Sequence, residues 1–209
     1  ILGLSHTMGV DGITGGQYDY NFTEAEVYKR FWLNSWGKID CMLKGGVQWN
    51  KVPYPFLIYP AANLSYIMED YTFNLIKNME FLNDRYASAM ISWDLNGKIL
   101  NRIPLIRGLK WREYIGINCL WGTLTDKNNP FLERHYGDSE LFYFPGSFRE
   151  DGSFEYNSHV MDKNKPYVEL VAGIHNIFKI FHIEYVHRMN YMYEGTQRWG
   201  IRGTFRVTF

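Results

Sequence analysis

The strongest constraint in this sequence is a period-two alternation that recurs along most of the chain and is clearest at its end. In the terminal stretch "RWGIRGTFRVTF", polar or small residues alternate with a mainly apolar set. This set consists of Trp199, Ile201, Gly203, Phe205, Val207 and Phe209. Strict alternation over this length predicts a β-strand with one apolar and one polar face.

The same period recurs upstream and predicts an all-β, antiparallel fold. The alternating segments are residues 23–33, 37–49, 71–81, 85–97, 110–122, 166–174 and 181–191, with a weaker one at 1–10. With the terminal segment they make eight strands, or nine if the weak first one is counted. A chain of 209 residues suits one domain, so residues 1–209 are expected to form a single unit.

Strand length and aromatic placement favour a transmembrane β-barrel. The sequence contains no run of 18 apolar residues, so no transmembrane helix is predicted. Barrel strands are not excluded, because their apolar residues are spread through an alternating pattern. Trp111 and Trp121 share a face, and ten residues of tilted strand span roughly 25 Å, the height of the apolar band between two aromatic girdles. Trp199 and Phe209 repeat this spacing. The predicted membrane-interface aromatics are Trp49, Trp111, Trp121, Trp199 and Phe209.

The opposite face of the predicted strands is charged and would point into the barrel lumen. Its charged residues include Glu24, Glu26, Arg30, Lys38, Asp40, Lys44, Glu169, Glu184, Arg188, Arg202 and Arg206. Because both signs occur on neighbouring segments, these side chains would either line a solute pathway or form a cross-strand ion-pair lattice, and the lattice is the favoured interpretation.

Connection lengths predict the orientation, because outer-membrane barrels have short periplasmic turns and longer external loops. If the terminal strand runs inward, the polar stretch 123–165 lies outside with 191–198, 82–85 and 34–36. Residues 50–70, 98–109 and 175–180 then lie inside, and the C-terminus is periplasmic. The three prolines of 50–70 exclude a central strand, so this stretch is expected to pack against the barrel mouth or lumen.

Several other functions lack support in the sequence. The 22 basic and 22 acidic residues cancel, which argues against a nucleic-acid partner. The two cysteines have no zinc spacing, and His182 and His187 point to opposite faces, so neither a metal site nor a cofactor is expected. Two alternatives remain open: a membrane-embedded hydrolase, for which Ser88, Ser92 and His182 are the candidates, and a soluble β-barrel or sandwich that binds an apolar ligand.

Five segments together resemble an uncharacterised family of Bacteroidota outer-membrane proteins, in which a carboxypeptidase-regulatory-like β domain precedes a C-terminal barrel. They are "GKIDCMLKGGVQWNKVPYPFL", "FNLIKNMEFLNDRY", "RIPLIRGLKWRE", "PYVELVAGIHNIFKIFHIEYVHR" and "WGIRGTFRVTF". The resemblance implies that this chain is the C-terminal part of a larger barrel whose first strands and any periplasmic domain are missing. It implies no catalytic residues.

A second, shorter resemblance is to the outer-membrane assembly and secretion family with a Val-Arg-Gly-aromatic motif. Ile106-Arg107-Gly108 resembles this motif, but Leu109 stands where the family has an aromatic residue.

The expected function is a non-enzymatic transport, receptor or assembly role in the envelope of a Gram-negative bacterium. The terminal strand that ends on Phe209 resembles the signal by which outer-membrane barrels are recognised for insertion. The expected partners are therefore outer-membrane lipid, the barrel-assembly machinery and other envelope proteins.

Overall fold

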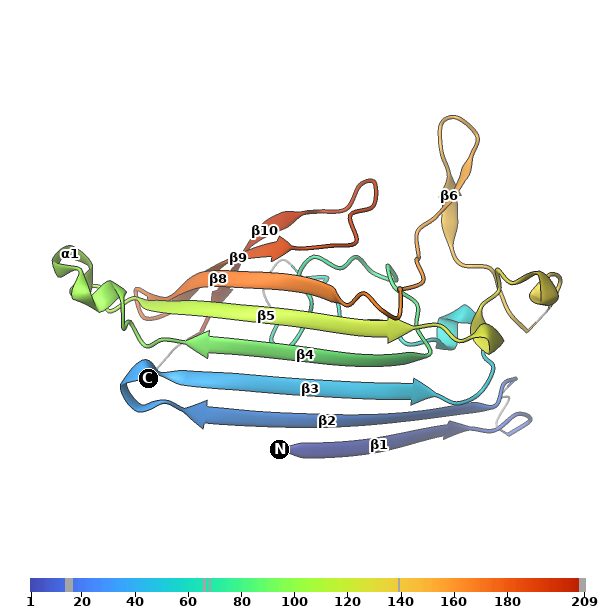
Figure 1. Cartoon of the computed structure of the whole chain (residues 1–209), viewed down its shortest axis with the longest axis horizontal. Coiled ribbons are helices and arrows are strands. Elements are labelled where there is room, and N and C mark those ends of the chain that lie inside the picture. Colours follow the sequence, from blue (N-terminus) through green and yellow to red (C-terminus); the bar gives the residue numbers. More distant parts are fainter. Residues whose placement is uncertain (14–16, 66, 68, 139, 207–209) are drawn as a thin grey trace.

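One antiparallel sheet of eight strands dominates the computed structural model (Figure 1). The structure describes residues 1–13, 17–65, 67, 69–138 and 140–206. The strands of the sheet, in spatial order, are β1 (Leu2–Gly9), β2 (Tyr20–Trp32), β3 (Lys38–Gln48), β4 (Arg85–Asp94), β5 (Arg112–Thr123), β8 (Tyr167–Ile177), β9 (Phe181–Arg188) and β10 (Trp199–Phe205). Chain order and spatial order agree, so the predicted all-β, antiparallel fold is confirmed.

The remaining elements are short and lie in the connections. Strands β6 (Gly146–Phe148) and β7 (Phe154–Tyr156) form a hairpin that projects from the sheet (Figure 1). The single α-helix of the described residues is α1 (Pro104–Arg107). The 3₁₀ helices are η1 (Asn34–Trp36), η2 (Tyr54–Phe56), η3 (Leu100–Arg102), η4 (Asp126–Asn128) and η5 (Glu133–His135).

The alternation of the sequence sets the register of the sheet, because a slip by one residue would turn every side chain to the other face. In the observed register, apolar residues line up from strand to strand in rows. One row contains Phe31, Ile39, Trp93, Ile115, Ala172, Tyr185 and Ile201. We call the face that carries these rows the convex face, and the opposite, charged face the concave face.

Among the described residues, the sheet is not closed, and β1 and β10 are its two edge strands. It is nevertheless strongly curved. Side chains of β2, such as Arg30, and of β9 and β10, such as His182 and Thr204, line one common cavity on the concave face.

The connections differ in length at the two ends of the sheet. At the turn end, residues 33–37, 95–111 and 178–180 join successive strands. At the loop end, the connections are residues 10–19, 49–84, 124–166 and 189–198. The two longest connections, 49–84 and 124–166, therefore lie together at the loop end, although 95–111 at the turn end is longer than 10–19 and 189–198.

This arrangement corrects part of the sequence prediction. Residues 71–81 are not a strand, so the chain crosses the sheet once less than expected. As a result, residues 50–70 lie at the same end as 124–166, and the turn at 34–36 lies at the opposite end. The long Pro-containing stretch is thus no exception to the length rule that the prediction used.

Residues 49–84, which we call the excursion, fold onto the concave face. Ile67 forms a β-bridge with Gly203 on the outer edge of β10. The ring of Tyr71 packs against the ring of Tyr28 in β2, with 5.8 Å between the ring centroids. The excursion therefore reaches from one side of the curved sheet to the other.

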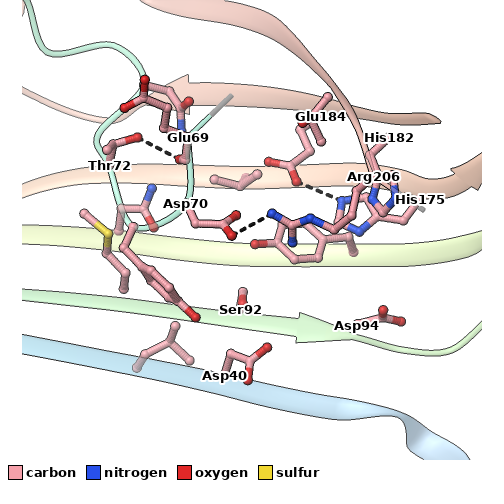
Figure 2. A pocket seen from close by; sticks show the side chains of 18 of the residues that line it. Asp40, Glu69, Asp70, Thr72, Ser92, Asp94, His175, His182, Glu184 and Arg206 are labelled. Carbon is pink, nitrogen blue, oxygen red and sulfur yellow. Dashed lines mark hydrogen bonds and ion pairs between the residues drawn. The ribbon is translucent and has the colours of Figure 1, made fainter. Parts of the chain in front are cut away.

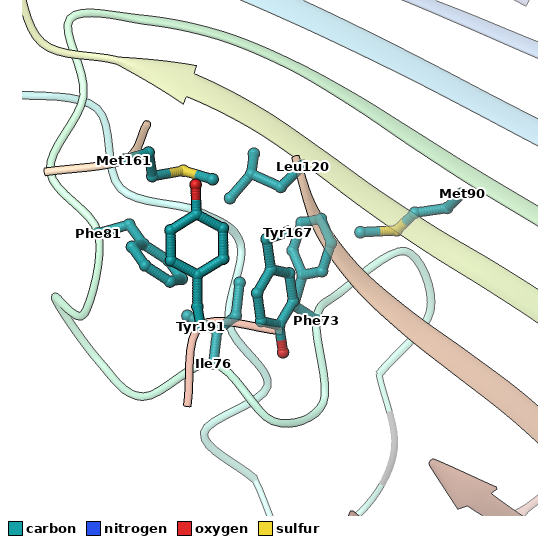
Figure 3. Packing of buried hydrophobic residues seen from close by; sticks show 8 residues of the cluster. All are labelled: Phe73, Ile76, Phe81, Met90, Leu120, Met161, Tyr167 and Tyr191. Carbon is teal, nitrogen blue, oxygen red and sulfur yellow. The ribbon is translucent and has the colours of Figure 1, made fainter. Parts of the chain in front are cut away.

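A hydrophobic cluster fixes the excursion against the sheet (Figure 3). It consists of Phe73, Ile76, Phe81, Met90, Leu120, Met161, Tyr167 and Tyr191. The first three come from the excursion, and the ring of Phe81 packs edge-on against that of Tyr191 at 5.2 Å. Since each buried aromatic side chain contributes roughly 1.5–3 kcal/mol, this cluster is a major part of what holds the excursion in place.

Gly37 lies in the turn between β2 and β3, where the backbone requires glycine. Its φ is +80°, and a Cβ atom there would lie 1.9 Å from the carbonyl oxygen of Asp94. Glycine is thus required at this position, which brings β3 back beside β2 and β4.

No helix among the described residues is long and apolar enough to cross a membrane.

Candidate functional site on the concave face

The charged residues that the sequence singled out lie on the concave face of the sheet. Two pairs of directly opposite residues on β2 and β3 form ion pairs there. Arg30 in β2 pairs with Asp40 in β3, with Nε 2.6 Å from Oδ1. Lys44 and Glu26 pair at 3.1 Å across the same two strands. Lys38 lies 3.9 Å from Asp40, and Glu24 accepts a hydrogen bond from the hydroxyl of Tyr86. These partly exposed pairs stabilise the sheet only slightly, by about 0–1 kcal/mol each.

Glu169 has a different role, because it binds the backbone of the excursion. Its side chain is fully buried, and its carboxylate accepts hydrogen bonds from the backbone N–H groups of Asn74 at 3.1 Å and Leu75 at 2.8 Å. Tyr167 and Asn118 donate to the same carboxylate, at 2.8 and 3.3 Å. A buried carboxylate with this many donors is well satisfied.

Arg188 completes this attachment from the next strand. Its guanidinium donates to both carboxylate oxygens of Glu80 and, at 3.3 Å, to the carbonyl of Leu75. It also lies over the ring of Tyr167, 4.8 Å from the centroid. Arg202 in β10 donates to the carbonyl of Asn74. We call Glu169, Arg188, Arg202 and Glu80 the clamp, since they bind residues 74–80 to the sheet.

The sequence interpretation missed Glu80, because it assigned residues 71–81 to a strand and gave Glu80 no role. Nothing in the local pattern identifies it, since its partner Arg188 is 108 residues away in the sequence.

A polar cavity of about 180 Å³ lies between the excursion and the turn end of the sheet (Figure 2). On one side, His175 and Glu184 are joined at 2.8 Å, and the ring of His175 stacks on that of Tyr114 at 4.2 Å. On the opposite side are Asp40, Ser92 and Asp94 from β3 and β4.

Two further groups shape this cavity. Arg206 pairs with Asp70 of the excursion at 2.6 Å, so the last of the predicted lumen charges also holds the excursion. His182 is buried, and among the described residues its Nε2 has no hydrogen-bond partner. The cavity therefore offers paired charges and one unpaired imidazole nitrogen to a small polar solute.

Among the described residues, no hydrogen bond joins the hydrolase candidates Ser88, Ser92 and His182. Ser92 and His182 line the same cavity, but strands β5 and β8 lie between their own strands, and no hydrogen bond joins them in the described part of the chain. Ser88 lines a different cavity, beside Tyr86 and Met90. A serine nucleophile needs its base within hydrogen-bond reach. There is also no group of three His, Cys, Asp or Glu side chains placed to hold one metal ion among residues 1–13, 17–65, 67, 69–138 and 140–206.

The tryptophans lie near the two ends of the sheet. Trp49, Trp121 and Trp199 are at the loop end. Trp111, which precedes β5, is at the turn end, together with Trp32, Trp36 and Trp93. Phe209, the fifth predicted interface aromatic, lies outside the described residues.

At the loop end, the excursion is also tied to the connection 124–166. Val52 donates its backbone N–H to the side-chain oxygen of Asn128 at 2.9 Å, and Asn128 in turn donates to the buried carboxylate of Asp84. The Nζ of Lys51 lies 2.9 Å from Glu140 and also bonds Asp138. This lysine holds the pKa of Asp138 below its usual range.

The chain belongs to a family of unknown function, since the sequence model of the C-terminal domain of DUF5686 matches residues 1–137. The expected relationship to the C-terminal part of an uncharacterised family is thereby confirmed. No curated protein and no solved structure matches the chain.

Proposed function

We propose that this chain forms part of a transmembrane β-barrel of the bacterial outer membrane and serves as a non-enzymatic receptor or transport component of the cell envelope. One observation carries the proposal: apolar side chains are exposed on one face of the sheet, whereas charged side chains of β8 and β9 are buried on the opposite face. Leu43, Ile91, Ile117 and Leu170 are exposed on adjacent strands of the convex face, whereas Glu169 and Arg188 are buried on the concave face.

A soluble antiparallel sheet buries its apolar face against a core and turns its polar face to water. An exposed apolar surface across eight strands is far larger than soluble monomers tolerate. In a barrel, lipid covers the outward apolar band and polar side chains fill the interior. Lys29, Glu113 and His187 interrupt the convex face, each near the end of its own strand. Long charged side chains near strand ends, such as those of Lys29 and Glu113, reach the membrane interface.

The proposed orientation follows from the connections and the tryptophans. The loop end, with its long connections, would face the outside, and the turn end would face the periplasm together with the C-terminus. The tryptophans near the two ends would lie at the two membrane interfaces.

The excursion supports a receptor or gated transporter over an open diffusion pore. It crosses the concave face and is fixed there by the clamp and by the cluster around Phe73 and Phe81. A lumen filled in this way leaves the cavity near His175 and His182 as the space for a small polar solute.

Detergent partition and heat-modifiable gel migration test the membrane proposal, because a folded barrel runs differently from the boiled protein. The two free cysteines, Cys41 and Cys119, give a sharper test, since register places both on the convex face. In lipid vesicles, a hydrophobic maleimide should label them and a charged, water-soluble maleimide should not. A chain that is monomeric and soluble without detergent contradicts the proposal.

A further inference from the structure

The connection between β4 and β5 concentrates positive charge at the turn end. Residues 95–112 include five basic side chains and no acidic one: Lys98, Arg102, Arg107, Lys110 and Arg112. The chain as a whole is neutral, so this segment is a local exception. A basic segment beside a membrane surface is attracted to anionic lipid headgroups.

Three of these cations line one pocket. Arg107, Lys110 and Arg112 surround a space of about 370 Å³ whose other lining residues are Asn96, Asn101 and Asn176, so no carboxylate faces it. In the part of the chain that the structure describes, no ion pair neutralises these three side chains. Cations gathered without a counter-charge repel one another, and a bound anion would relieve that repulsion.

The pocket is built by the fold and does not depend on a flexible side chain alone. The side-chain amide of Asn176 in β8 donates to the backbone carbonyl of Lys110 at 2.8 Å. Lys110 and Asn176 both have left-handed backbone conformations, with φ of 54° and 63°. This contact fixes the start of β5 against the end of β8 and directs the connection over the turn end.

Exposed apolar side chains stand beside these cations. Ile103, Leu105 and Leu109 are exposed in the same connection, and Leu105 is 91% exposed. In the neighbouring β8–β9 turn, Phe178 is 82% exposed. Cations next to exposed aliphatic and aromatic groups match an amphiphile, in which a charged headgroup adjoins acyl chains.

We propose that this connection binds the phosphate of an anionic phospholipid in the pocket of Arg107, Lys110 and Arg112, while Leu105 and Leu109 lie against its acyl chains. The inference rests on the proposed membrane location and adds a specific lipid site to it. The exposed apolar side chains favour a phospholipid over free phosphate, because inorganic phosphate has no apolar group to contact them.

Native mass spectrometry of the detergent-purified protein tests the site. The probes are phosphatidylglycerol and phosphatidylcholine with identical acyl chains, and inorganic phosphate as competitor. The test variant replaces the pocket cations, as R107Q/K110Q/R112Q. The matched control, R134Q/K163Q/K165Q, removes three cations from the loop end. Heat-modifiable migration verifies that both variants are folded.

We expect the wild type and the control to retain phosphatidylglycerol over phosphatidylcholine, and the test variant to lose about 100-fold of that preference. L105S/L109S should weaken the retention of both lipids. Equal retention of the two lipids by the wild type, equal loss in the control, or full displacement by inorganic phosphate overturns the lipid site while leaving the membrane proposal intact. Failure of the wild type to enter micelles overturns both.

Discussion

Arg188 in β9 and Glu80 in the excursion form a two-pronged ion pair in which both side chains are buried, with 0% and 2% of their surfaces exposed. The arginine binds Leu75 and Tyr191 through their carbonyls as well. Its donors thus join the excursion to β9 and to the connection that follows β9. The pair thereby helps to hold the excursion against the concave face of the sheet.

Removal of one partner should release the excursion. In Glu80→Gln, Arg188 keeps its charge in a buried site without a counter-charge, so we expect a loss of about 3–5 kcal/mol in unfolding free energy. Urea denaturation measures this loss, and limited proteolysis within residues 49–84 should become faster. In planar bilayers, the same variant should conduct more than the wild type.

Arg149→Gln is the control for that variant, because Arg149 pairs with Glu155 and Glu194 on the exposed hairpin and connection. Its loss should cost less than about 1 kcal/mol. If Glu80→Gln were as mild as Arg149→Gln, the clamp would not hold the excursion.

A charge on the convex face should be costly only if lipid covers that face. Ile117 is 37% exposed in mid-sheet, and Ile117→Arg should reduce the unfolding free energy in lipid by about 2–4 kcal/mol. Phe148, 77% exposed on the projecting hairpin, is the control, and Phe148→Arg should stay within about 0.5 kcal/mol of the wild type. Equal, small effects in both variants would show that water, and not lipid, surrounds Ile117.

Gly37→Ala should destabilise the turn between β2 and β3. The added Cβ would overlap the carbonyl oxygen of Asp94 at 1.9 Å, and φ is positive, so we expect a loss of about 1–3 kcal/mol. Gly108→Ala is the control, since its φ is −68° and its Cβ would meet no atom within 4 Å. That variant should be neutral or slightly stabilising. The urea midpoints of the two variants provide the comparison.

Acid should loosen the packing of the connection 124–166 on the excursion. Burial lowers the pKa of His159, although the nearby Glu80 favours its protonated form. Its ring stacks on that of Tyr193 with the centroids 3.7 Å apart, and its backbone N–H donates to the backbone carbonyl of Glu80. Below about pH 6.5 the unfolded segment binds a proton that the folded one excludes, so the stability that the neutral ring provides is lost as the pH falls.

The amide protection factors of residues 157–165 and 189–198, which relate each exchange rate to the intrinsic rate at the same pH, measure this change at about pH 8 and about pH 5. His159→Phe keeps an aromatic ring on Tyr193 but cannot be protonated, so its protection factors should depend less on pH. The same acid-induced loss of protection in both proteins would assign the effect to another group.

The alternation of the sequence was sufficient to predict an all-β, antiparallel fold and the two faces of its strands, because side chains two residues apart share a face. It was misleading at residues 71–81, where Phe73 and Leu75 alternate with polar residues yet are packed by the sheet and by Glu169. Tertiary contacts override a local pattern of this kind.

The site was predictable only in part for a related reason. Arg30, Asp40 and Arg188 lie on strands, so their face follows from the period. Glu80 and Asp84 lie in irregular chain, where the hydrogen bonds they make depend on partners far away in the sequence. His175 was assigned to a connection, because β8 continues to Ile177 past an irregularity in its pairing with β9.

The excursion is attached to two parts of the molecule: its ends bond the connection 124–166 through Val52 and Asp84, and its middle bonds the sheet, for example through Glu169 and Arg188. Its docking therefore depends on the conformation of that connection. A ligand that binds the connection more tightly when the excursion is docked must favour docking by the same factor. Events at the surface and the occupancy of the interior are in this way linked thermodynamically.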